Sequence, residues 1–155
     1  MNRARRRFAS FYLAAAGAAF LVSGPVLGDE QPGFCPVEGG RLRYEVAGSG
    51  PAVVLMHDGL VDLRVWDGVW GELAKSFRVV RYDRRGYGES PAPAEPFLPR
   101  DDLRRVMDCA GVPVATLVAS SAGSDLALRT AVAFPSRVER LVLIGPVVSG
   151  LGFSK

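Results

Sequence analysis

The chain carries short, mostly apolar runs separated by segments of a different period. Residues 52–56, 77–82, 114–119 and 138–144 are such runs, and each has the length of a strand that is covered on both faces. Residues 41–47 instead alternate charged and apolar side chains, which predicts a half-exposed strand at the edge of a sheet.

Segments between these strands are predicted to be helices. In the first, apolar residues recur at i, i+3, i+4 and i+7, namely Trp66, Val69, Trp70 and Leu73. The second extends from Asp101 and Asp102, which can cap its N-terminus, to Gly111 at its C-terminus. Its apolar face consists of Leu103, Val106, Met107 and Ala110. The third covers residues 122–134 and is stopped by Pro135.

The alternation of strands and helices indicates the α/β class, with a mostly parallel sheet, helices on both faces and right-handed crossovers. Ligands of such sheets bind at the carboxyl ends of the strands, so we expect the chemistry there. The helical spacing of Trp66 and Trp70 favours a place in the core over the wall of a pocket.

Length and composition are those of one folded domain. The chain has 155 residues, of which 48% are hydrophobic and 23% charged, so it can bury a core. Four arginines in the first seven residues account for the net charge of +3, since without residues 1–28 it would be +3 − 4 = −1. The charge therefore gives no sign of a nucleic-acid partner. Gly and Pro in residues 29–40 predict a linker, and residues 41–155 form the domain.

The first 28 residues are typical of a targeting segment. The arginines precede an uncharged, Ala-rich run from Phe8 to Gly28, which offers a small residue for cleavage. We favour a cleaved signal peptide, and an exported protein that is periplasmic or extracellular, because Gly and Ala make the run only moderately apolar. The alternative is an uncleaved anchor that holds the protein at a membrane through residues 8–28, since about 20 apolar residues can span a bilayer.

Cys35 and Cys109 are the two cysteines of the chain. An exported chain can pair them in a disulfide, but we expect Cys109 to pack on a helix as a small apolar residue. Their spacing matches no metal-binding motif, and the sequence implies neither a metal nor a cofactor.

Ser121 stands where an apolar strand turns directly into a helix. A nucleophile at such a junction lies on a sharp, strained turn that exposes its hydroxyl. Ala119 and Gly123, two residues to either side, are small enough for this turn. The free N–H groups at the start of the helix would stabilise a developing oxyanion. The alternative is structural, because serines also cap helices.

Three other segments complete a pattern along the chain. Residues 56–59 read Met-His-Asp-Gly, residues 83–90 read Asp-Arg-Arg-Gly-Tyr-Gly-Glu-Ser, and residues 137–143 read Arg-Val-Glu-Arg-Leu-Val-Leu. Together with the segment around Ser121 they resemble the N-terminal half of the α/β-hydrolase superfamily. The resemblance is to its group of serine esterases, lactonases, peptidases and cofactor-free haloperoxidases.

The resemblance implies roles for a few residues. Ser121 matches the nucleophile, and the backbone N–H of Ala122 matches one donor of the oxyanion hole. The second donor would be the N–H of Asp58 or Gly59, although Asp58 stands where the family usually has glycine. His57 matches a residue that supports the oxyanion loop. A serine rather than an aspartate at position 121 argues against the epoxide-hydrolase and haloalkane-dehalogenase branches.

The resemblance assigns a structural role to the loop at residues 83–90. Its glycines permit tight turns, and Arg85 is interpreted as a hydrogen-bonding strut rather than a substrate clamp.

A serine hydroxyl needs an adjacent base, which in this family is a histidine that follows the nucleophile and an acid along the chain. His57, the single histidine, precedes Ser121, and residues 145–155 contain no Asp or Glu. The resemblance therefore implies a hydrolase of a small-molecule ester, lactone or amide that acts through an acyl-Ser121 intermediate and is truncated before its acid and base. The alternative is a non-catalytic remnant or an exported binding module. The apolar strand at residues 138–144 would then be an exposed edge, through which we expect the chain to self-associate.

Overall fold

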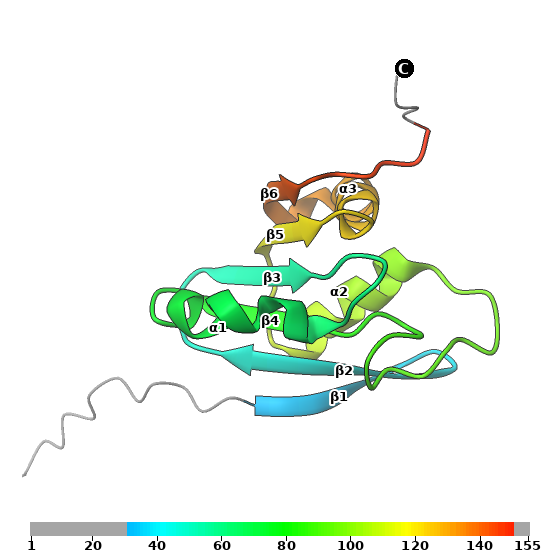
Figure 1. Cartoon of the computed structure of the whole chain (residues 1–155), viewed down its shortest axis with the longest axis horizontal. Coiled ribbons are helices and arrows are strands. Elements are labelled where there is room, and N and C mark those ends of the chain that lie inside the picture. Colours follow the sequence, from blue (N-terminus) through cyan, green and yellow to red (C-terminus); the bar gives the residue numbers. More distant parts are fainter. Residues whose placement is uncertain (1–30, 151–155) are drawn as a thin grey trace, which may run out of the picture.

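The computed structural model describes residues 31–150, which form a six-stranded sheet with helices on both faces (Figure 1). The predicted targeting segment at residues 1–28 lies outside the described residues. The strands are β1 (Gln31–Val37), β2 (Gly40–Ala47), β3 (Ala52–Met56), β4 (Arg78–Tyr82), β5 (Ala115–Ser120) and β6 (Val138–Ile144). The helices are η1 (Leu63–Trp66), α1 (Asp67–Ala74), α2 (Pro99–Cys109), α3 (Gly123–Ala133) and η2 (Pro135–Arg137).

The strand order is β1-β2-β4-β3-β5-β6. Strands β4, β3, β5 and β6 are parallel to one another, whereas β2 pairs with β4, and β1 with β2, in the antiparallel direction. This confirms the predicted α/β class with a mostly parallel sheet. Because β3 and β5 are direct neighbours, the loops after their carboxyl ends lie beside each other, and the loop after β4 lies on the other side of β3.

The two faces of the sheet are covered by different helices. On one face, Trp66 and Trp70 of η1 and α1 pack with buried residues of β3 and β4, as their spacing predicted. On the other face, α2 and α3 pack against the larger core, which includes Leu103, Met107 and Leu126. Among the described residues, no helix is long and apolar enough to cross a membrane.

Residues 31–37 correct the predicted linker at 29–40. They form β1, which pairs with β2 along its whole length. Strand β2, predicted to be the edge, is therefore an interior strand between β1 and β4. The Gly and Pro content misled because an edge strand tolerates a proline, such as Pro36, whose missing N–H is not needed for pairing.

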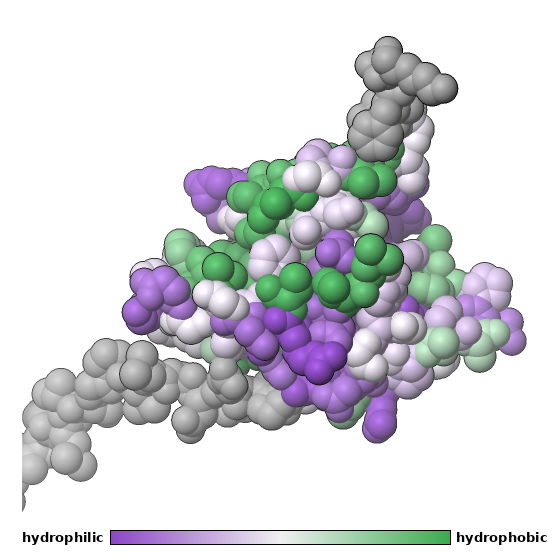
Figure 2. All heavy atoms as spheres, viewed as in Figure 1, coloured by the Kyte–Doolittle hydropathy of each residue, from purple (hydrophilic) through white to green (hydrophobic). Residues whose placement is uncertain are grey.

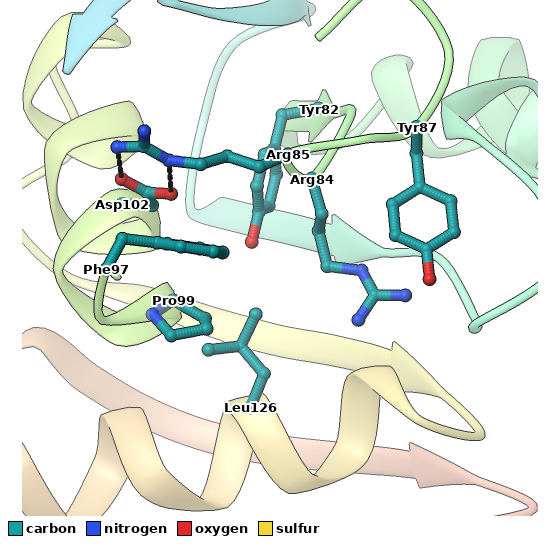
Figure 3. A pocket seen from close by; sticks show the side chains of 8 residues that line it. All are labelled: Tyr82, Arg84, Arg85, Tyr87, Phe97, Pro99, Asp102 and Leu126. Atoms are coloured by element: carbon teal, nitrogen blue, oxygen red, sulfur yellow. Dashed lines mark hydrogen bonds and ion pairs between the residues drawn. The ribbon is translucent and has the colours of Figure 1, made fainter. Parts of the chain in front are cut away.

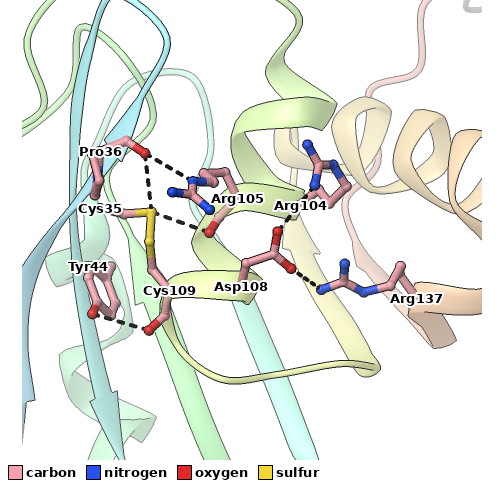
Figure 4. The surroundings of a disulfide bond; sticks show 8 residues. All are labelled: Cys35, Pro36, Tyr44, Arg104, Arg105, Asp108, Cys109 and Arg137. Carbon is pink, nitrogen blue, oxygen red and sulfur yellow. Dashed lines mark hydrogen bonds and ion pairs between the residues drawn. A yellow bond between two sulfur atoms is a disulfide. The ribbon is translucent and has the colours of Figure 1, made fainter.

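Cys35 and Cys109 form a disulfide, which the sequence analysis had not favoured (Figure 4). Cys35 lies on β1 and Cys109 at the end of α2, with 5.8 Å between their Cα atoms. The bond was hard to foresee because its first partner lies in the segment taken for a linker. It fixes β1 to the helix that covers the sheet.

The start of α2 also differs from the prediction. The helix begins at Pro99, after Leu98, so Asp101 and Asp102 lie in its first turn rather than at its cap. Proline suits the first position of a helix because its missing N–H would have no partner there. Asp102 is buried, and its carboxylate accepts two hydrogen bonds from Arg85.

Strand β6 is the open edge of the sheet. Val142 and Ile144 are 46% and 49% exposed, and apolar side chains are visible in this region of the surface (Figure 2). The strand was predicted from its apolar character, and its bounds are those expected.

Candidate functional site

Ser121 occupies a strained turn between β5 and α3. Its φ is +47°, and it is the only residue other than glycine in the described chain with a positive φ. Its N–H donates to the carbonyl of Ile144 at 2.9 Å, and its own carbonyl accepts from the N–H groups of Ser124 at 2.9 Å and Val147 at 3.3 Å. The backbone is thus held in a conformation that costs a non-glycine residue about 1–3 kcal/mol.

Gly123 allows the turn to approach the end of β3. A Cβ atom at this position would lie 2.8 Å from the carbonyl oxygen of His57 and 3.0 Å from that of Met56. Such contacts are too short for any side chain, so only glycine fits. Ala119 is fully buried and pairs with Met56 in the sheet. Close packing against the end of β3 therefore explains why the residues two positions before and after Ser121 are small.

Three backbone N–H groups in the segments next to Ser121 have no acceptor among the described residues. Within residues 31–150, those of Asp58, Gly59 and Ala122 donate to no protein acceptor. A Cβ at Gly59 would lie 3.5 Å from the Cβ of Ala122, so the two segments are in contact distance. The carboxylate of Asp58 accepts the N–H of Leu60 at 2.6 Å and is thereby engaged within its own loop.

His57 is fully buried below this loop. Its Nε2 accepts the backbone N–H of Arg84 at 3.1 Å, which requires that Nδ1 carries the proton and donates to the carbonyl of Asp58 at 2.7 Å. Burial, reinforced by the charge of Arg84, lowers the pKa of His57 to about 4. The imidazole is therefore neutral at pH 7, and both of its nitrogens are occupied by the backbone.

Two residues that the sequence analysis did not single out complete this network. The guanidinium of Arg84 donates to the carbonyl of Asp58 and lies 4.8 Å from the ring centre of Tyr87. The hydroxyl of Tyr87 donates to the carbonyl of Gly59 at 3.1 Å, and its ring meets that of His57 edge-on. The sequence indicated only that the loops after β3 and β4 follow neighbouring parallel strands and so lie close together. Which side chains meet there depends on their directions, which the sequence does not give.

The loop at residues 83–90 has the structural role expected of it. Asp83 accepts the N–H groups of Leu63 and Glu89, each at 2.8 Å. Gly88 has a φ of +50°, and a Cβ there would collide with the Asp83 carboxylate. Arg85 binds Asp102 with two hydrogen bonds of 2.7 and 2.9 Å and donates to the carbonyl of Glu38, which confirms the interpretation as a strut.

The hydroxyl of Ser121 has no base beside it in the described part of the chain. No side chain of residues 31–150 forms a hydrogen bond with Ser121 Oγ. The same residues contain no group of three or more His, Cys, Asp or Glu side chains that could hold a metal ion. The site thus presents a strained serine and free N–H groups without a proton acceptor.

Comparison with known proteins agrees with this geometry. A family model described as the alpha/beta hydrolase fold matches residues 51–153. Among curated proteins, the 2-hydroxymuconate semialdehyde hydrolase of Pseudomonas sp. is 35% identical over 124 residues, which are 72% of this chain and 44% of that protein. An uncharacterized protein of Mycobacterium tuberculosis is 32% identical over 114 residues, 72% of this chain and 33% of its own length.

Among solved structures, the chain is similar to an alpha/beta hydrolase fold protein from Burkholderia ambifaria, with a TM-score of 0.71 and 26% identity over 79% of this chain and 46% of that one. The chain superposes on wild-type Cfl2 from Burkholderia cenocepacia with a TM-score of 0.73 and 26% identity, over 84% of this chain and 46% of that one. The chain spans less than half the length of each of these relatives.

Proposed function

Because the chain belongs to the alpha/beta hydrolase fold family, we propose that it supplies the nucleophile and oxyanion-binding part of a serine hydrolase for a small-molecule ester, lactone or amide. The observation that carries this proposal is the left-handed backbone of Ser121 at the junction of β5 and α3. The structural alternative, an N-cap, finds no support, because no side chain caps α3.

The oxyanion would be bound by two backbone donors. The N–H of Ala122 lies at the N-terminus of α3, where the helix dipole favours negative charge. We assign the second donor to Gly59 rather than Asp58, because Gly59 lies against Ala122. His57, Arg84 and Tyr87 fix the carbonyls of this loop and thereby aim its N–H groups.

In the proposed reaction, Ser121 Oγ forms a bond to the carbonyl carbon of the substrate while its proton passes to a base. The carbonyl electrons move to the oxygen, which accepts the two N–H groups. The base then protonates the leaving group as its bond breaks, and water repeats the sequence on the acyl-serine. His57 cannot be this base, since both ring nitrogens are engaged. We place the base and its acid in the part of the relatives' length that this chain does not cover.

A second function is a non-catalytic binding module, which is favoured by the absence of a base at Ser121 Oγ within residues 31–150. A fluorophosphonate probe separates the two. We expect it to label the native chain slowly at Ser121 and not to label Ser121→Ala. Ser120→Ala is the matched control, because Ser120 ends β5 one residue earlier, and it should label like the native chain. Absence of labelling in the native chain would favour the binding module.

We also propose that the protein is exported. The disulfide between Cys35 and Cys109 supports this, since such bonds persist in oxidising compartments. Fractionation of the producing cells, with the mass of the mature N-terminus, tests export and distinguishes a cleaved signal from an anchor. A reduced protein in the cytoplasm with residues 1–28 intact would contradict it.

A further inference from the structure

A small cavity lies beside the candidate site, between the loop after β4, the start of α2 and helix α3 (Figure 3). Its volume is about 110 Å³, and its walls include Tyr82, Arg84, Phe97 and Leu126. Most of the lining is apolar carbon, so a polar group of a ligand could form hydrogen bonds with only a few side chains in the cavity.

The hydroxyl of Tyr82 is a buried donor without an acceptor. Tyr82 is 1% exposed, and its hydroxyl oxygen has no hydrogen-bond partner. Burial raises the pKa of Tyr82, so the group remains an O–H. In Figure 3 this hydroxyl points into the cavity toward Leu126. A buried polar group of this kind is costly unless a ligand or water satisfies it.

Arg84 supplies an unbalanced positive charge to the same cavity. Its guanidinium donates to the Asp58 carbonyl, but its Nε is buried without a partner and no carboxylate among the described residues pairs with it. Arg85, which also lines the cavity, is neutralised by Asp102. The net charge facing the cavity is therefore that of Arg84.

A larger hollow of about 400 Å³ lies next to this cavity and extends to Ala122, the residue after Ser121. The two share Arg84, Pro99 and Leu126 as walls, and Ala122 lines the larger one. Arg100 and Arg129 also line it, against a single acid, Asp125, which pairs with Arg129 at 2.6 Å. An anion that enters is thus attracted by excess positive charge and arrives next to the residue after Ser121.

We propose that the cavity is a subsite for a carboxylate group of the substrate, so that the compound cleaved at Ser121 is a carboxylic acid that also carries the scissile ester, lactone or amide. This rests on the proposed function. One carboxylate oxygen accepts the hydroxyl of Tyr82 and the other accepts Nε of Arg84, which satisfies both buried donors. A single negative charge balances the one free guanidinium, whereas a phosphate dianion would leave charge uncompensated in an apolar cavity.

The test compares the monomethyl esters of succinate, glutarate and adipate with their dimethyl esters. Binding to the 155-residue chain in the Ser121→Ala background is measured by calorimetry or ligand-observed NMR at low salt. We expect the best monomethyl ester to bind at least about tenfold more tightly than its dimethyl counterpart. Arg84→Gln and Tyr82→Phe should each remove most of this difference.

Matched controls are Arg104→Gln on α2 and Tyr44→Phe on β2, neither of which lines the cavity. Both should keep the preference. Tyr82→Phe deletes only an unpartnered hydroxyl, so a normal melting temperature with lost preference assigns the effect to binding.

Equal binding of charged and neutral esters, or a preference that survives both cavity variants, overturns the subsite. Phosphonate labelling of Ser121 in the native chain is scored separately. Labelling without carboxylate preference leaves the proposed function standing, whereas carboxylate preference without labelling supports the subsite and removes the support for a nucleophile.

Discussion

The two edges of the sheet are built in opposite ways. At the β1 edge, the Cys35–Cys109 disulfide fixes the strand to α2, Pro36 removes one backbone donor, and Arg41 covers the ring of Phe34 at 4.2 Å. At the β6 edge, Val142 and Ile144 are about half exposed and no strand follows within the described residues. One edge is protected against pairing with another chain, and the other offers an apolar surface for it.

The difference bears on the site because the open edge is the one next to Ser121. The carbonyl of Ile144, the last residue of β6, holds the N–H of Ser121. The open edge therefore lies next to the turn that carries Ser121. The protected edge is separated from Ser121 by three intervening strands, β2, β4 and β3, and by β5 itself.

The largest expected effect on stability comes from removing the disulfide at the protected edge. Replacing both cysteines with serine should lower the free energy of unfolding by about 4 kcal/mol, because the bond closes a loop with a sequence separation of 74. Chemical denaturation of the oxidised protein and of the double variant measures this. Reduction of the native protein should reproduce the loss, and an unchanged midpoint would show that β1 is held by strand pairing alone.

The next prediction concerns the buried His57, which lies between the two edges and makes the stability of the fold depend on pH. The pKa of His57 lies at about 4 in the folded chain, below its ordinary 6.5, so the unfolded chain binds more protons between these values. Stability from this group is complete above pH 6.5 and is lost as the pH falls toward 4, by about 3 kcal/mol in all.

Denaturation midpoints between pH 7 and pH 4 measure this loss, with His57→Gln as the comparison. The variant should be less stable at pH 7 but should lose less on acidification. If the midpoint of His57→Gln falls between pH 7 and pH 4 as much as that of the native chain, groups other than His57 cause the acid sensitivity.

The smallest expected effect concerns the open edge. Val142→Lys with Ile144→Lys should weaken self-association of the chain by about tenfold, because like charges oppose strand pairing at an edge. Sedimentation equilibrium of the native and variant chains measures it. Phe34→Lys places a charge on the protected edge, where Phe34 is 40% exposed, and should leave association unchanged. If Phe34→Lys weakens association equally, the two edges do not differ as described.

Much of the fold and part of the candidate site were predictable from local pattern. The apolar runs located β3, β4, β5 and β6, and the small residues around Ser121 indicated the turn that its φ of +47° now describes. Local pattern failed at residues 31–37, because a strand rich in Gly and Pro acquires its identity from its partner strand rather than from its own propensity. The disulfide was missed for the same reason.

By itself, then, the sequence determined the order of the strands from β2 onward, the class of fold and the position of the nucleophile turn, since these follow from periodicity and from steric limits on neighbouring residues. Only the tertiary structure decided what surrounds that turn. It brought Arg84 and Tyr87 to His57 and the loop at Asp58 and Gly59, left the hydroxyl of Tyr82 unpaired in a cavity, and put the open edge next to Ser121. Such contacts join residues far apart in the chain, and their geometry depends on strand order and side-chain direction, which no local pattern encodes.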